Sequence, residues 1–156
     1  TAAAVGLKEG VRRDPMAMKP FCGYHFGDYF AHWLSFDTPG AKLPGIFHVN
    51  WFRKGEDGRF LWPGFGENLR VLEWILGRVD GTATARETPI GWLPEHGALD
   101  LDGLNLPDGV LDALLEIDPA AWKAEMDSVQ QSLEELGERV PQALREECRR
   151  TGAALG

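Results

Sequence analysis

The chain has 156 residues, of which 44% are hydrophobic, and a formal net charge of −8. This length suits one domain, which could bury about 68–70% of its unfolded surface if it folded alone. An acidic chain with no basic run and no apolar run near the roughly 18 residues of a membrane span is a poor candidate for binding nucleic acid or a membrane, so we expect neither partner.

The charge is unevenly divided along the chain. Residues 1–70 hold nine Lys or Arg against seven Asp or Glu, a balance of +2, whereas residues 71–156 hold seven against seventeen, a balance of −10. Anionic ligands are therefore expected on the first half.

The chain has two cysteines, Cys22 and Cys148, and neither lies in a CxxC or Cys/His spacing. The sequence thus predicts no zinc site and no disulfide framework, and a reduced cytoplasm is the expected location. His32 follows Asp28 by four residues and His25 by seven, but no ligand set is complete there, and we expect no metal site in the chain.

In chain order, residues 1–10 are small and lack a hydrophobic period, as in a mobile loop or a frayed terminus. A stripe with helical spacing follows and is expected to be core; it consists of Phe26, Tyr29, Phe30, Trp33 and Leu34. Residues 46–52 alternate as a β-strand does. The turn pair Asp57-Gly58 then predicts a hairpin-like loop that brings residues 51–52 near residues 60–62.

Next comes a predicted helix over residues 69–76, which Gly77 is expected to stop. Phe52, Phe60, Phe65 and Asn68 could then converge on one spot. Stacking of a flat heterocycle on such rings is worth about 1–3 kcal/mol per base. The Asn68 amide can read a base edge, since guanine presents its O6 acceptor next to its N1–H donor and adenine has neither of these two groups. Alternatively, the rings are core and Asn68 caps the helix.

The second half is more regular. Residues 79–88 indicate a polar connection, and residues 89–94 an extended segment fixed by prolines. Asp118 is a good N-cap for a helix that begins at Pro119 and runs to Gly137. A second, short helix is expected from Pro141 to about Arg150.

Residues 46–54, 60–68 and 70–74, which include Phe60-Leu-Trp-Pro-Gly-Phe-Gly-Glu-Asn68, closely resemble the C-terminal part of the GTP-dependent phosphoenolpyruvate carboxykinases. Residues 14–24, 27–34, 88–91 and 97–101 are similar to flanking segments of that family, so the resemblance covers residues 1 to about 140. It implies a mixed α/β fold in which residues 1–156 form the C-terminal part of the GTP-binding catalytic domain.

The resemblance also assigns roles. The positions matching Phe52, Phe60 and Phe65 enclose guanine in the family, the one matching Asn68 hydrogen-bonds it, and Trp51 is a further candidate. Residues 46–76 would form the guanine pocket, residues 118–150 the C-terminal helices, and residues 1–13 part of an active-site lid. The lid residues would include Thr1, Ala2, Ala3 and Ala4. At His25 the family usually has Asn.

The implied reaction converts oxaloacetate and GTP to phosphoenolpyruvate, CO₂ and GDP in gluconeogenesis. It needs a phosphate cradle and Mn²⁺ or Mg²⁺, yet no GxxxxGK[ST] run is present, and we expect the metal ligands and catalytic residues in a missing N-terminal part of the same enzyme. Because the chain starts at Thr1, we expect a fragment that is inactive alone. The alternatives are a non-catalytic guanine-nucleotide-binding module and a fragment that does not fold by itself.

Overall fold

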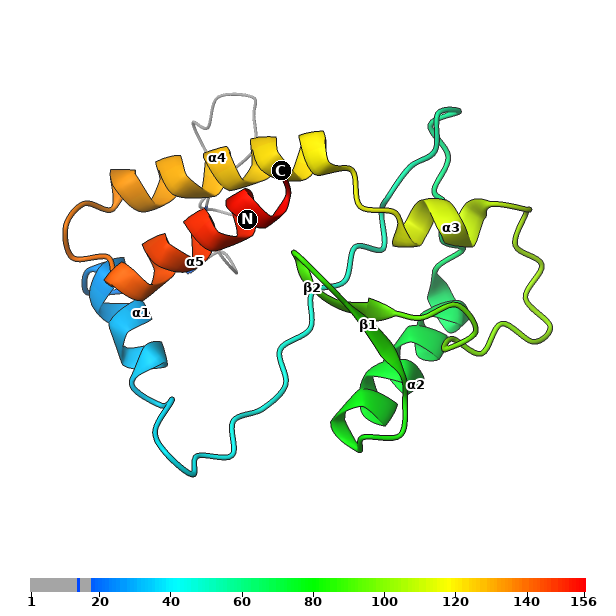
Figure 1. Ribbon diagram of the computed structural model, residues 1–156, viewed down its shortest axis with the longest axis horizontal. Coiled ribbons are helices and arrows are strands. Elements are labelled where there is room, and N and C mark those ends of the chain that lie inside the picture. The colour runs from blue at the N-terminus through cyan, green and yellow to red at the C-terminus, as the bar shows by residue number, and fades with distance from the viewer. Residues whose placement is uncertain (1–13, 15–17) are drawn as a thin grey trace. The chain divides into compact units, whose positions relative to one another are not determined.

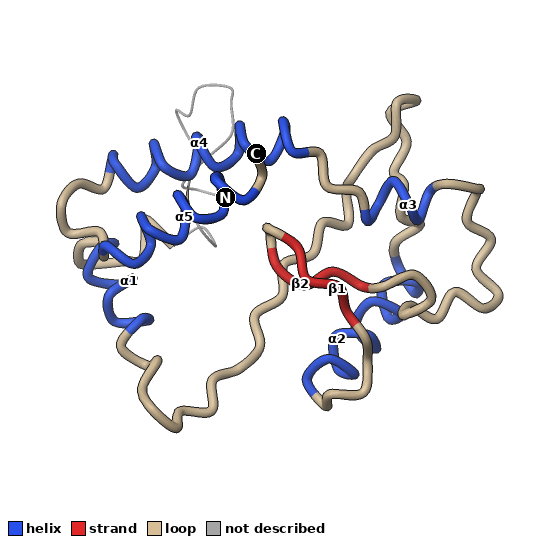
Figure 2. Tube along the Cα trace, viewed as in Figure 1, coloured by secondary structure: helices blue, strands red, loops and turns tan. Residues whose placement is uncertain are grey.

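A computed structural model describes residue 14 and residues 18–156 of the chain. The chain divides into two compact units (Figure 1), one drawn from residues up to Leu43 together with Pro119–Gly156, the other from Pro44–Asp118. Helices and one two-stranded antiparallel sheet occur among the described residues (Figure 2), which confirms the mixed α/β class. The expected lid, with Thr1, Ala2, Ala3 and Ala4, lies outside the described residues.

The first unit contains α1 (Phe26–Leu34), which begins where the aromatic stripe predicted it. The Nδ1 atom of His25 accepts a hydrogen bond from the N–H of Gly27 at 2.9 Å. The first N–H groups of a helix have no partner within the helix, and an Asn side chain at this position would satisfy one in the same way. His25 is therefore the N-cap of α1.

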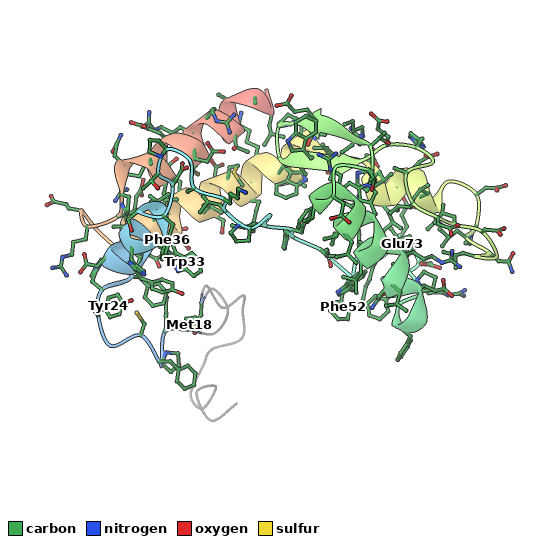
Figure 3. The ribbon with its side chains drawn as sticks, turned by 90° about the horizontal axis from the view of Figure 1, so that it is seen from below. Met18, Tyr24, Trp33, Phe36, Phe52 and Glu73 are labelled. Atoms are coloured by element: carbon green, nitrogen blue, oxygen red, sulfur yellow. The ribbon has the colours of Figure 1, made fainter. Side chains whose placement is uncertain are left out.

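The aromatic stripe of α1 is only partly buried, so the prediction of a core stripe is wrong for its second half. Phe26 is buried, whereas Trp33 is 55% exposed. The close approach that buries the helix occurs at its first turn, where Gly27 meets the backbone of Arg139. Beyond that turn the rings pack on one another, and Trp33 meets Phe36 edge to face at 6.1 Å (Figure 3).

The same unit contains α4 (Pro119–Glu135) and α5 (Gln142–Ala154), which lie antiparallel and side by side (Figure 1). The start of α4 at Pro119 is as predicted. However, α5 continues past Arg150 and through Gly152. Small residues let the two helices approach, since Gly152 lies close to Met126 and the Cys148 thiol donates to the Met126 carbonyl at 3.4 Å. This packing outweighs the poor helix propensity of glycine.

The second unit contains α2 (Asn68–Val79), β1 (Ala85–Thr88), β2 (Gly91–Pro94) and α3 (Val110–Leu115). The strands pair antiparallel, with Ala85 opposite Pro94 and Thr88 opposite Gly91. The sequence indicated an extended segment at β2 but a polar connection at β1, and it did not predict α3. Arg86 helps to join these parts, since its guanidinium donates to the carbonyl of Leu115 at the end of α3.

Gly77 does not stop α2, contrary to the prediction. It lies inside the helix, which ends at Val79 and is terminated by Gly81, where φ is +73°. The N–H of Thr82 donates to the Gly77 carbonyl at 2.8 Å and that of Gly81 to the Arg78 carbonyl at 3.3 Å, the paired bonds of a Schellman cap. A Cβ on Gly77 would lie 2.9 Å from the Cβ of Ala83, so this glycine allows the chain to fold back on the helix.

Residues 46–52 form no strand. The side chain of Asn50 accepts a hydrogen bond from the N–H of Phe52 at 2.9 Å, and this local bond turns the chain at Trp51. A strand also needs a partner for its backbone groups. In the described part of this region, the single bridge found pairs Lys54 with Phe60.

One side of α2 packs on its own unit and one side does not. Trp74 is buried, and its indole N–H donates to the Thr84 carbonyl at 3.0 Å. Four apolar side chains of the helix are between 44% and 66% exposed, namely Leu69, Leu72, Leu76 and Val79. No helix among the described residues has the length and apolar character that crossing a membrane requires.

Candidate functional site

The hairpin-like loop predicted around Asp57-Gly58 is present. Lys54 and Phe60 form an antiparallel bridge, and Gly58 has a φ of +76°, which glycine adopts without strain. The carboxylate of Asp57 accepts a hydrogen bond from the N–H of Arg59 at 3.0 Å. The loop therefore brings its two arms together by the turn chemistry that the sequence indicated.

The two phenylalanines on these arms face each other. The rings of Phe52 and Phe60 meet edge to face, with centroids 5.8 Å apart and planes at 63°. Phe52 is 71% exposed and Phe60 is 56% exposed, and Figure 3 labels Phe52 at the surface of its unit. Trp51, beside Phe52, is half-buried. Phe52 and Phe60 are thus not core residues, contrary to the alternative that the sequence left open.

Phe65 is the most exposed large hydrophobic residue in the described part of the chain, at 95%. It follows Gly64 and opens the short 3₁₀ helix η3 (Phe65–Glu67), and its φ is +51°. A positive φ at a residue other than glycine costs roughly 1–3 kcal/mol, and residues in this conformation are concentrated at functional sites. Phe65 makes no ring contact with another aromatic residue among those described.

Asn68 is the first residue of α2, and the residue before it, Glu67, occupies the N-cap position without a side-chain cap. The alternative in which Asn68 caps the helix is therefore wrong. Its side-chain Oδ1 instead accepts a hydrogen bond from the indole Nε1–H of Trp62 at 2.9 Å. Trp62 is 5% exposed, so a buried ring holds one end of the amide.

Arg70 holds the start of α2 in place and was not among the predicted site residues. Its guanidinium donates to the carboxylate of Glu67 and, at 2.8 Å, to the carbonyl of Asp100. The hydrogen bond with Glu67 is the largest cause that raises the pKa of Arg70. The spacing of Glu67 and Arg70, three residues apart on one helical turn, is the signal by which the sequence could have revealed this pair.

The cations near the rings have different uses. Arg53 donates to the carbonyls of Leu114 and Glu116 at 3.2 and 3.3 Å, and so satisfies backbone acceptors at the end of α3. The ammonium of Lys54 lies 5.4 Å from the centroid of the Phe60 ring. Lys54 and Arg59 are exposed, and Arg59 forms an ion pair with Asp57 at 3.4 Å. Arg53, by contrast, stabilises the fold.

The structure thus joins Phe52 to Phe60 through the hairpin and Phe65 to Asn68 through η3, within one unit. The two pairs offer flat apolar rings and an amide, which are the kinds of group that a planar heterocycle with a polar edge requires. In residue 14 and residues 18–156, no group of three His, Cys, Asp or Glu side chains could hold a metal ion.

The comparisons with known proteins agree with one another on the family of this chain. The family described as the phosphoenolpyruvate carboxykinase C-terminal P-loop domain matches residues 1–154. The chain is similar to the GTP-dependent phosphoenolpyruvate carboxykinase of Chlamydia trachomatis, with 51% identity over 99% of this chain and 26% of the relative. The same enzyme of Neocallimastix frontalis is 53% identical over 92% of this chain and 24% of the relative. The chain thus spans about a quarter of the length of these relatives.

Proposed function

The chain belongs to the GTP-dependent phosphoenolpyruvate carboxykinase family, and we propose that Phe52, Phe60, Phe65 and Asn68 bind the guanine base of GTP or GDP. The observation that carries this proposal is the conformation of Phe65, a ring 95% exposed on a backbone with a φ of +51°. For stability alone, glycine would be favoured at this position. A ligand that covers the exposed ring gives a physical reason for a phenylalanine there.

The phenylalanine rings would supply affinity. Stacking of a base on an aromatic side chain contributes about 1–3 kcal/mol and does not depend on the identity of the base. Phe52 and Phe60 already meet each other, so the hairpin provides one wall of the pocket. Phe65, on η3, provides a second. Half-buried Trp51 lies beside Phe52 and would support that wall from behind.

Asn68 would distinguish guanine from adenine. Its amide group can donate to the O6 acceptor of guanine, whereas adenine carries an amino group at that edge. Asn68 lies at the start of a helix whose first turn is held by Arg70. The amide is therefore carried by a rigid element, as selective hydrogen bonding requires.

The proposal extends to the reaction of the complete enzyme, in which oxaloacetate and GTP give phosphoenolpyruvate, CO₂ and GDP in the cytoplasm, during gluconeogenesis. Mn²⁺ or Mg²⁺ would stabilise charge on the phosphates. The described residues do not fit such an ion, so its ligands and the catalytic groups are assigned to the rest of the enzyme. The lid role of Thr1, Ala2, Ala3 and Ala4 belongs to the same proposal. The 156 residues alone should be inactive.

The rest of the enzyme would also cover α2. Leu69, Leu72, Leu76 and Val79 form an exposed apolar face on this helix, which we call the α2 face. Apolar surface of this kind is favourably buried against a partner. The relatives are about four times as long as the chain, and the additional residues of the same enzyme are the proposed partner.

The test is nucleotide binding. Six tryptophans, with Trp51 and Trp62 next to the proposed pocket, should report GDP by a change in fluorescence. The titration would use the 156-residue chain and a chimera in which this chain replaces the matching quarter of the Chlamydia trachomatis relative. GDP should bind more tightly than ADP to both, and the chimera alone should form phosphoenolpyruvate from oxaloacetate and GTP.

Phe60→Leu is the informative variant, because leucine is apolar but cannot stack. It should weaken GDP binding by about 1–3 kcal/mol, roughly 5- to 150-fold. Phe36→Leu is the matched control on the other unit, where Phe36 is 49% exposed, and its GDP affinity should equal that of the wild type. Equal affinity of the wild type for GDP and ADP would refute the base-reading role of Asn68. GDP binding by a chimera that forms no product would favour a non-catalytic nucleotide-binding module.

A further inference from the structure

The hydrogen bond between Trp62 and Asn68 fixes which way the Asn68 amide points. An indole N–H can only donate, so its partner must be the amide oxygen and not the amide nitrogen. Trp62 is buried, and its Nε1 lies 2.9 Å from Oδ1 of Asn68. If the amide rotated by half a turn, two donors would face each other and a buried N–H would lose its partner, which is strongly disfavoured.

This bond leaves the donor end of the amide for a ligand. No described residue accepts a hydrogen bond from Nδ2 of Asn68, which is half-buried at the start of α2. Oδ1 retains a second lone pair after it has accepted the bond from Trp62. The amide therefore presents a fixed N–H donor beside an acceptor, in the order that the O6 and N1–H groups of guanine require.

A freely rotating amide would not discriminate in this way. Asparagine has similar shapes in its two amide orientations, so an unrestrained Asn68 could turn its oxygen towards the amino group of adenine and accept it as readily. Specificity requires an element that penalises the wrong ligand. The locked orientation is such an element, because it sets the amide N–H₂ against the adenine amino group.

We infer that Trp62 is the positioning residue for base selection: its indole N–H locks the Asn68 amide in the orientation that accepts 6-oxopurines such as guanine and rejects adenine. This inference rests on the proposed function and adds a residue that touches no part of the nucleotide. Trp62 determines the preference between bases and contributes little to the affinity for the preferred base.

Three ligands test the inference, namely GDP, IDP and ADP, titrated by calorimetry into the wild type and into Trp62→Phe, using the chain and the chimera. IDP keeps the O6 and N1–H groups of guanine, so the wild type should bind it nearly as tightly as GDP. In Trp62→Phe the ring remains and the donor is lost. The preference for GDP over ADP should fall by at least about fivefold, mainly through tighter binding of ADP.

A matched control is available on the same unit. Trp74 is 7% exposed and also donates its indole N–H to an internal acceptor, the carbonyl of Thr84. Trp74→Phe should therefore destabilise the unit to a similar extent and leave the preference between bases unchanged. If Trp62→Phe does not fold, benzothienylalanine incorporated at position 62 keeps the indole shape without the N–H, and it should relax the preference in the same way.

The outcomes are distinct. A wild type that binds neither nucleotide overturns both the proposed function and the role of Trp62. A wild type that prefers GDP, together with a Trp62→Phe variant whose GDP-to-ADP ratio is unchanged, overturns the role of Trp62 alone. In the Asn68→Ala background, Trp62→Phe should not change the ratio of GDP affinity to ADP affinity any further. An additional change in the double variant would also contradict the inference.

Discussion

Gly64 and Phe65 both have a positive φ, at +78° and +51°, so two successive residues before α2 lie in the left-handed part of backbone space. Glycine tolerates this conformation, but phenylalanine does not adopt it without cost. Since Phe65 is also 95% exposed, its side chain buries little apolar surface and contributes little to the stability of the folded chain.

Phe65→Gly should therefore separate stability from binding. Removal of the side chain relieves about 1 kcal/mol of backbone strain, partly offset by the greater freedom of glycine in the unfolded chain. The free energy of unfolding, measured in urea, should stay equal or rise. GDP affinity should fall roughly 5- to 150-fold through loss of stacking.

Phe65→Ala is the companion variant, because it loses the ring but keeps the strained backbone. It should match Phe65→Gly in GDP affinity and be the less stable of the two. If either variant bound GDP as tightly as the wild type, Phe65 would have no place in the nucleotide site.

The α2 face should respond differently in the chain and in the complete enzyme. Leu72 and Leu76 are 44% and 64% exposed, so replacing both by Gln should change the stability of the 156-residue chain by no more than about 0.5 kcal/mol each. In the chimera, where the proposed partner covers them, the same pair of substitutions should cost about 1.5–3 kcal/mol per leucine. Thermal unfolding of both proteins measures the difference, and equal small effects in both would show that the α2 face stays uncovered.

Local chemistry explains what could be predicted from the sequence. The turn at Asp57-Gly58 and the start of α4 at Pro119 depend on neighbouring residues, and both were predicted. The ends of α2 and α5 were wrong because Gly77 and Gly152 are kept in helices by contacts with residues distant in sequence or beyond the helix end. A helix propensity does not include such contacts.

For the candidate site, too, some features could be predicted from the sequence and others could not. The residue types and spacing of Phe52, Phe60 and Asn68 indicated a base-binding role. Their exposure, the positive φ of Phe65 and the bond from Trp62 to Asn68 could not be read from the sequence, because each depends on how the hairpin and α2 pack. The predicted strand at residues 46–52 failed because alternation indicates a strand only where a partner strand is available.

Gly27 should tolerate no side chain. A Cβ there would lie 2.5 Å from the carbonyl oxygen of Arg139, and a backbone group cannot move aside as a flexible side chain can. Gly27→Ala would gain up to about 1 kcal/mol of helix propensity but should lose about 1–3 kcal/mol through overpacking. The net loss of stability should appear in urea unfolding. Gly23→Ala is the control, since nothing lies within 4 Å of its Cβ, and a loss as large there would contradict the packing explanation.

The thiol of Cys148 should titrate at a higher pH than an ordinary cysteine. Burial is the largest cause that raises its pKa, and the charge of Asp127 raises it further. Only the thiolate reacts with alkylating reagents. In single-cysteine variants made by Cys22→Ser or Cys148→Ser, iodoacetamide should therefore modify Cys148 more slowly than half-buried Cys22.

The same pKa shift makes the stability of the protein depend on pH. An unfolded chain loses the thiol proton near the ordinary value of about 8.5, whereas the folded chain retains it to a higher pH. The stabilising contribution of the Cys148 thiol is thus complete below about pH 8.5 and is lost as the pH rises through the folded-state value. Above about pH 8.5, the free energy of unfolding in urea should fall more steeply with pH for the wild type than for Cys148→Ala. Parallel pH profiles for the two proteins would show that the thiol is not held in its neutral form by the packing of α5 on α4.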